Sequence, residues 1–144
     1  MTNPITSTRL VLLGGEHPRD RAKALQTLLD NRSLQGKTTV LANSEIFSVA
    51  TVAEQNELFE LDKARKQSGI HLLRLAPGCL CCSSKLILGT QVARTLRLNR
   101  PDLLILELDS SSHVDKVREV FSEDQWTGWF DQIDICQTTP KSSK

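Results

Sequence analysis

The chain has 144 residues, of which 39% are apolar and 24% charged, a composition typical of one compact folded domain. Lys and Arg total 18 against 17 Asp and Glu, so no overall field favours nucleic acid or an acidic membrane. Aromatic residues make up only 4%, too few for a platform that stacks single-stranded nucleic acid. No apolar stretch approaches the roughly 18 residues of a membrane-spanning helix, and the N-terminus lacks a signal-peptide pattern. We therefore expect a cytoplasmic protein without nucleic-acid or membrane partners.

Predicted strands and helices alternate along the chain. The run Leu103–Leu106 is continuously apolar, which is typical of a strand buried on both faces of a parallel sheet. We predict an α/β domain of three layers over residues 1–136, with a mainly parallel sheet flanked by helices, and a polar tail at 137–144. The predicted strands are 9–13, 37–41, 71–75, 103–108 and 133–136, and the predicted helices are 19–30, 56–66, 84–98 and one that starts near residue 112.

The spacing of apolar residues also predicts which side chains face the core. Residues 45–55 give no clear pattern, and the apolar side of helix 56–66 consists of Leu58, Phe59 and Leu61. Trp126 and Trp129, with Phe130, predict a cluster at the edge of the core or facing a partner. Ser83 or Ser84 would cap the helix that ends at Leu98, and the inward positions of the last two helices are Leu86, Ile87, Val92, Leu96, Leu98, Val114, Val117, Val120 and Phe121.

The most specific feature is a cluster of three cysteines. Cys79, Cys81 and Cys82 lie within four residues and follow Pro77–Gly78. This spacing does not fit a disulfide framework, whereas three thiolates can bind one face of a tetrahedral ion such as zinc or copper(I). We predict a transition-metal site, with redox sensing or plain packing as alternatives.

A fourth ligand has to come from another segment. The loops that follow parallel strands all open on the carboxyl edge of the sheet. This rule places His17, Glu45 and the segment 107–113, which includes Glu107 and His113, on the same edge as the cysteines. Any of these side chains could complete the site, or a second copy of the chain could supply thiols in a homodimer.

Two glycine-containing segments bear on nucleotide binding. Gly36-Lys37-Thr38-Thr39 has the letters that end a P-loop, but Asn31 stands where the loop needs its first glycine, and Thr38 begins a predicted strand. The first strand-to-helix turn, residues 14–21, lacks a Lys-Ser or Lys-Thr pair and carries Glu16 and Asp20. We predict that neither segment binds phosphate, and that Pro18 starts a helix after a plain turn.

Three motifs together resemble the CobW-like P-loop GTPases, a family of proposed metal chaperones and insertases. Residues 78–82 resemble its Gly-Cys-x-Cys-Cys motif, and residues 40–45 resemble its strand ending in Asn-Glu, with Glu45 displaced by one position. Residues 100–110 resemble its Arg-Pro-Asp and the following strand, which ends in Glu-x-Ser-Gly, with Ser110 in place of the glycine. The resemblance extends from about residue 9 to residue 136 and implies a P-loop NTPase-like fold.

The resemblance also implies roles for individual residues. Cys79, Cys81 and Cys82 would bind zinc or a related metal, Glu45 would be an additional ligand, and Glu107 would match the Walker B-like glutamate. The family's Gly-x-x-Gly-x-Gly-Lys-Thr-Thr loop is missing at residues 14–23, and its guanine-selecting Asn-Lys-x-Asp segment does not follow the last predicted strand. Without the loop's lysine and hydroxyl the phosphates lose their main charge neutralisation, so we expect neither GTP binding nor hydrolysis.

Three hypotheses of different classes follow. The first is a metal-binding accessory or regulatory protein, a pseudo-GTPase that holds zinc or another transition metal in its Cys-x-Cys-Cys loop. The second is a GTP-binding metallochaperone or GTPase with an atypical phosphate loop. The third is a non-catalytic scaffold that pairs with itself or with another protein. Metal content, nucleotide titration and light scattering separate them.

Overall fold

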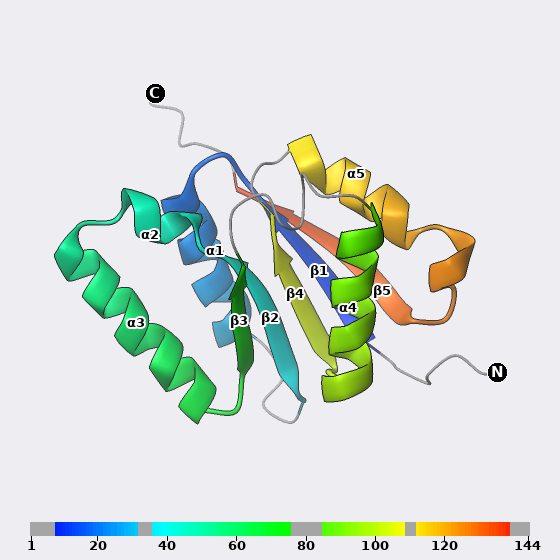
Figure 1. Cartoon of the computed structure of the whole chain (residues 1–144), viewed down its shortest axis with the longest axis horizontal. Helices are drawn as coiled ribbons and strands as arrows, with labels where there is room; N and C mark the ends of the chain where they lie inside the picture. The colour runs from blue at the N-terminus through cyan, green and yellow to red at the C-terminus, as the bar shows by residue number, and fades with distance from the viewer. Residues whose placement is uncertain (1–7, 32–35, 76–84, 109–111, 139–144) are drawn as a thin grey trace.

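The computed structural model describes residues 8–31, 36–75, 85–108 and 112–138, without the side chains of 85–87, 112 and 113 (Figure 1). All strand pairs in the sheet are parallel, and the strand order is β3-β2-β4-β1-β5. The predicted α/β class with its parallel sheet is therefore confirmed. The strands are β1 (Thr8–Gly14), β2 (Thr38–Asn43), β3 (His71–Leu75), β4 (Leu103–Glu107) and β5 (Phe130–Gln137).

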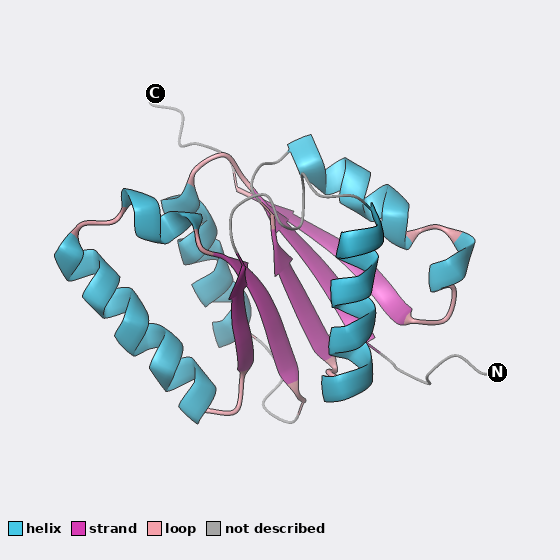
Figure 2. Cartoon of the chain, in the orientation of Figure 1, coloured by secondary structure: helices cyan, strands magenta, loops and turns pink. Residues whose placement is uncertain are grey.

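Helices cover both faces of the sheet, which makes three layers (Figure 2). Residues of α1 pack on one face together with Ile70, which lies in the loop after α3. Residues of α4, α5 and η1 pack on the other face. On one side lie α1 (Pro18–Asp30), α2 (Glu45–Val49) and α3 (Val52–Gln67), and on the other lie α4 (Lys85–Asn99), α5 (Ser112–Phe121) and the short 3-10 helix η1 (Asp124–Trp126).

The central strands β1 and β4 are buried on both faces, as the apolar run Leu103–Leu106 predicted for β4. Leu10, Leu12, Leu104 and Leu106 face α4 and α5, because alternate residues of a strand point to the same side. Val11, Leu13 and Ile105 face α1 in the same way, as part of the second core cluster. The outer strands β3 and β5 are more exposed. This arrangement places the ends of β1, β2 and β4 side by side in the middle of the carboxyl edge.

Several predictions about the helices need correction. α3 begins at Val52, four residues before the predicted start, because Thr51 and Glu54 form a capping box. Its predicted apolar side is wrong for Phe59, which is 58% exposed, and for Leu61, which is 37% exposed, whereas Leu58 is half-buried. α3 lies beside the edge strand β3, and its buried residues are Asp62 and Arg65.

Three further outcomes concern the chain after residue 85. Leu98 in the last turn of α4 is 71% exposed and not part of the core, although Val92 and Leu96 are fully buried as predicted. Trp126 and Trp129 lie in the core beside α4 and α5. Gln137 belongs to β5 and not to the predicted tail. The predicted caps Ser83 and Ser84 and the side chains of Leu86 and Ile87 lie outside the described part.

Within the described ranges, every helix is too short or too polar to cross a lipid bilayer.

Candidate functional site

The carboxyl ends of three neighbouring strands surround one buried arginine. β1 ends at Gly14, and α1 begins at Pro18 after three intervening residues. Pro18 occupies the first turn of α1, where its missing N–H costs nothing. Arg21 follows on α1 and points inward. Leu25 and Leu29, each about one helical turn further along, lie on the same buried face of the helix. Its side chain is fully buried, with 0% exposure.

The Arg21 guanidinium is bound on each of its nitrogens. Nε donates to Oε2 of Glu107 at 2.9 Å, and Nη2 donates to Oε1 of Glu45 at 2.6 Å. Nη1 donates to the carbonyl oxygen of Gly15 at 2.6 Å. Arg21 therefore joins α1 to the end of β4, the start of α2 and the turn after β1. The planar guanidinium of arginine can donate to all three of these acceptors at once, and the ammonium group of a lysine would not reproduce these contacts.

Glu107 is the buried partner in this network. It is 2% exposed, and its Oε1 accepts the backbone N–H of Asn43 at 3.1 Å. Burial raises the pKa of the Glu107 carboxyl, and the Arg21 guanidinium and the Asn43 N–H limit that rise. Burial by itself would lower the pKa of Arg21, but its hydrogen bonds to the Glu45 and Glu107 carboxylates, with their charges, outweigh burial and raise that pKa. The ion pair with Arg21 thus offsets part of the cost of burying the Glu107 carboxyl.

The turn after β1 is closed from outside by the end of β5. The backbone N–H of Thr138 donates to the Gly14 carbonyl at 2.9 Å. A Cβ atom on Gly15 would collide with the Thr138 hydroxyl, so glycine is needed at this close approach. Only Gly15, Glu16 and His17 separate β1 from α1, whereas a P-loop uses about eight residues, whose backbone N–H groups surround the phosphates. The described turn therefore offers fewer backbone N–H groups than a P-loop does.

Glu45 lies where the end of β2 meets the end of β3. Its backbone N–H donates to the Asn43 side chain at 2.6 Å, and its own side chain is 35% exposed. The preceding Ser44 donates to the carbonyl of Leu75 through both its N–H and its Oγ, each at 2.9 Å. Leu75 is the last described residue before the cysteine segment. Glu45 is thus adjacent to the strand end from which that segment continues.

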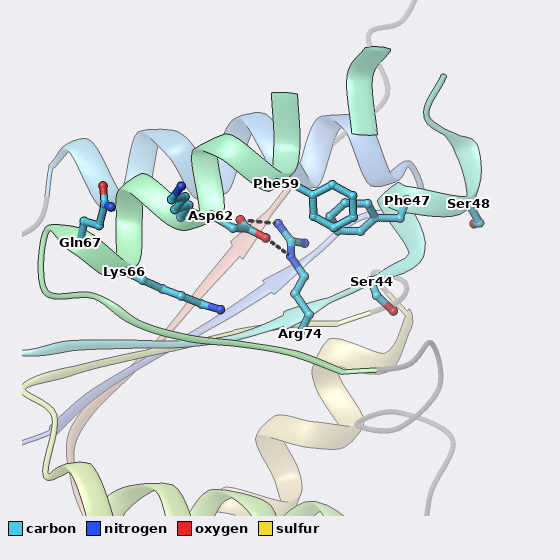
Figure 3. A pocket seen from close by; sticks show the side chains of 9 residues that line it. Ser44, Phe47, Ser48, Phe59, Asp62, Lys66, Gln67 and Arg74 are labelled. Atoms are coloured by element: carbon cyan, nitrogen blue, oxygen red, sulfur yellow. Dashed lines mark hydrogen bonds and ion pairs between the residues drawn. The ribbon is translucent and has the colours of Figure 1, made fainter. Parts of the chain in front are cut away.

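A groove of about 950 Å³ lies on the outer side of this junction, between α2, α3 and β3 (Figure 3). Arg74 of β3 spans it and binds both carboxylate oxygens of Asp62 at 2.9 and 3.0 Å. The same guanidinium lies 5.2 Å from the ring centre of Phe47, which stacks on Phe59 at 4.9 Å. Its Nη1 donates to the Asn43 carbonyl at 2.8 Å. The groove is therefore connected to the buried site through Asn43, but its arginine is already neutralised.

The other predicted candidates are distributed as follows. Cys79, Cys81 and Cys82 lie outside the described residues, as does the side chain of His113. His17 precedes α1 at the carboxyl edge without capping it through its side chain. Within the described part, no group of three or more His, Cys, Asp or Glu side chains could hold a metal ion. The described Cys136 on β5 is a free thiol, and burial raises its pKa.

Sequence reasoning missed Arg21, the residue that organises this edge. A usable signal was present, because positions 21, 25 and 29 follow one helical face and two of them are leucine. A charged residue on a buried helical face needs a counter-charge. Glu45 and Glu107, both assigned to this edge because parallel strands end on the same side of the sheet, are those counter-charges.

The parallel sheet, its flanking helices and the acidic strand ends define an α/β domain of the P-loop NTPase-like class. The family model "CobW/HypB/UreG, nucleotide-binding domain" matches residues 23–136, well over half of the chain. The chain belongs to this family, as the cysteine and strand-end motifs indicated. The match begins after β1 and the turn that Arg21 closes. No curated protein and no solved structure matches the chain.

Proposed function

We propose that this chain is a metal-binding member of the CobW/HypB/UreG family that does not hydrolyse GTP. The observation that carries the proposal is Arg21, which is fully buried and paired with Glu45 and Glu107 beside the shortened turn. The fixed Arg21 guanidinium balances the negative charge of the two carboxylates, which would otherwise need a bound cation to balance it. The Glu107 carboxylate, with both oxygens bound inside the protein, is therefore used for structure.

The shortened turn supports the loss of nucleotide chemistry. Phosphoryl transfer depends on backbone donors, a lysine and a bound magnesium ion around the phosphates. The turn has three residues and contains no lysine, and Thr138 packs against it. Glu107, the match to the Walker B-like glutamate, has one carboxylate oxygen on Arg21 and the other on the Asn43 N–H.

The proposed metal is zinc or another transition metal, bound by Cys79, Cys81 and Cys82. The support is the spacing of three soft ligands in the sequence and the position of Glu45 next to Leu75, where the segment begins. Glu45 remains the proposed additional ligand, although its Oε1 already binds Arg21. The protein would act as an accessory or regulatory metal carrier in the reducing cytoplasm, where thiolates persist.

Elemental analysis of protein purified under reducing conditions tests the metal site. We expect one zinc per chain in the parent, and a loss of most of it in Cys81→Ser and Cys82→Ser. Cys136→Ser is the matched control, because that thiol lies on β5 in the described fold, and it should keep its zinc. Equal zinc in the parent and in both cysteine-loop variants would contradict the metal proposal. Glu45→Gln keeps an acceptor for Arg21 and tests the additional ligand.

Calorimetric titration with GTP and magnesium on the same samples tests the loss of nucleotide chemistry. We expect no micromolar binding and no turnover. Measurable hydrolysis by the parent would favour the alternative of an active GTPase with an atypical loop. Zinc bound without nucleotide binding distinguishes the proposed carrier from a plain scaffold, which would bind neither.

A further inference from the structure

A second pocket lies on the opposite face of the sheet, between α4 and η1. Its volume is about 550 Å³. α4 contributes Thr90, Arg94 and Arg97, and the region of η1 contributes Gln125, Trp126 and Trp129. No acidic side chain lines it in the described part of the chain. The pocket shares no lining residue with the edge that Arg21 organises.

Within the described part of the chain, the two arginines of this pocket have no carboxylate partner. Among the described residues, five other arginines form ion pairs with Asp or Glu, namely Arg9, Arg19, Arg21, Arg65 and Arg74. Neither Arg94 nor Arg97 has such a partner within those residues. The two lie three positions apart and therefore point to the same side of α4. Two adjacent guanidinium groups without carboxylates attract an anion.

The aromatic residues that line the pocket suit the planar, apolar part of a ligand. The Arg97 guanidinium lies 5.6 Å from the ring centre of Trp129, an arrangement that orients it as a planar surface. Trp126 and Trp129 meet edge to face at 5.4 Å between ring centres. Trp126 is 7% exposed, and its Nε1 has no hydrogen-bond partner in the described structure. A buried indole N–H without an acceptor is rare and costs stability.

We propose that the α4–η1 pocket binds a small organic anion that combines a planar ring with a phosphate or carboxylate group. The anionic group pairs with Arg94 and Arg97, with Thr90 and Gln125 beside it, and the ring lies against the tryptophans. The groove at β3 does not offer the same chemistry, because Asp62 already binds its Arg74 on two nitrogens.

Tryptophan fluorescence reports on this pocket directly, since the chain has two tryptophans and both line it. We would titrate the full chain with phenyl phosphate, with inorganic phosphate and with benzyl alcohol as separate probes. We expect phenyl phosphate to quench the fluorescence in a saturable way. Inorganic phosphate, which lacks the ring, should bind at least about tenfold more weakly, which corresponds to about 1.4 kcal/mol. Benzyl alcohol, which lacks the charge, should give no saturable change.

Charge variants assign the effect to the two arginines. Arg94→Gln and Arg97→Gln should each weaken phenyl phosphate binding by about tenfold or more, since each removes one charge-assisted contact. Arg118→Gln is the matched control, because Arg118 is an exposed arginine on α5 that does not line the pocket, and it should leave the affinity unchanged. Arg97→Lys keeps the charge without the planar fork and should fall between the parent and Arg97→Gln.

Circular dichroism would verify that each variant keeps the parent fold. Arg94 has no intramolecular charge partner among the described residues, so Arg94→Gln decides the question even if Arg97→Gln disturbs the tryptophans. The proposal is overturned if phenyl phosphate does not quench at millimolar concentration, or if folded Arg94→Gln binds it as tightly as the parent. Equal affinities for phenyl phosphate and inorganic phosphate would show that the ring adds nothing to binding, and would overturn the claim that the ligand contains a planar ring.

Discussion

Arginines occupy two regions of this domain in opposite electrostatic situations. At the carboxyl edge, Arg21 is fully buried and bound by two glutamates and a backbone carbonyl. In the α4–η1 pocket, Arg94 and Arg97 line a cavity that contains no acidic side chain in the described structure. Both regions lie next to a buried core made of strands and helices.

The difference separates a structural arginine from one that is available to a ligand. Removing a charge from water is tolerated only when protein groups replace its hydration and balance it. Arg21 meets that condition internally, so the contacts that it makes join segments of the fold. Arg94 and Arg97 are exposed and have no carboxylate partner among the described residues, so they retain the capacity to bind an anion. The following predictions test this contrast, from the largest expected effect to the smallest.

Arg21→Ala should cause the largest loss of stability. It leaves Glu107 buried without its positive partner, and breaking a buried pair in this way costs about 3–5 kcal/mol. Urea unfolding measures the change. Arg19→Ala, two positions earlier on the same helix, removes an exposed ion pair and serves as the control, with a much smaller loss.

A double variant sharpens that result. Glu107→Gln in the Arg21→Ala background removes the uncompensated charge, so the double variant should be more stable than the sum of the two single changes predicts. Strict additivity would mean that the ion pair does not account for the loss.

The instability of Arg21→Ala should also depend on pH. Burial already raises the pKa of Glu107 above its ordinary value of 4.5, and without the Arg21 guanidinium that rise is opposed less, by the Asn43 N–H and the more distant Arg74 alone. The folded variant then binds more protons than the unfolded chain between pH 4.5 and the raised pKa, so its stability falls as the pH rises through this window. Unfolding free energies at several pH values should show a deficit against the parent that is smallest near pH 4 and grows toward neutrality. A deficit that is independent of pH would assign the loss to packing alone.

Arg94→Gln should have the smallest effect on stability. Its guanidinium has no carboxylate partner in the described structure, so the free energy of unfolding should change by no more than about 0.5 kcal/mol. The same urea experiment measures it. A loss comparable to that of Arg21→Ala would place Arg94 in an internal network and contradict the contrast between the two regions.

Local patterns in the sequence predicted most of the secondary structure but not the position of α3. The strand at 71–75 has the predicted bounds, and the central strand at 103–108 ends one residue earlier than predicted. The start of α3 was missed because its signal is the pair Thr51 and Glu54, which is a capping pattern and not an apolar repeat. Phe59 was assigned to the buried side, but an edge helix has little core to face, and Phe59 stacks on Phe47 instead.

The site was predictable in part. The common direction expected of parallel strands brought Glu45 and Glu107 to one edge, and the structure places both of them on Arg21. The role of Arg21 depended on which strands are neighbours, and no local pattern shows this. The metal ligation proposed for Cys79, Cys81 and Cys82 stays a prediction from their spacing.

The sequence by itself determined the alternation of strands and helices, the buried central strands and the family motifs, because these depend on residues close together in the chain. Only the tertiary structure decided that Arg21 closes the edge of the sheet, because its partners Glu45 and Glu107 are 24 and 86 positions away. It likewise brought Arg94 and Arg97 against the two tryptophans to form one pocket. Charges acquire their roles from neighbours in space, and for these arginines the neighbours are set by how the helices pack on the sheet.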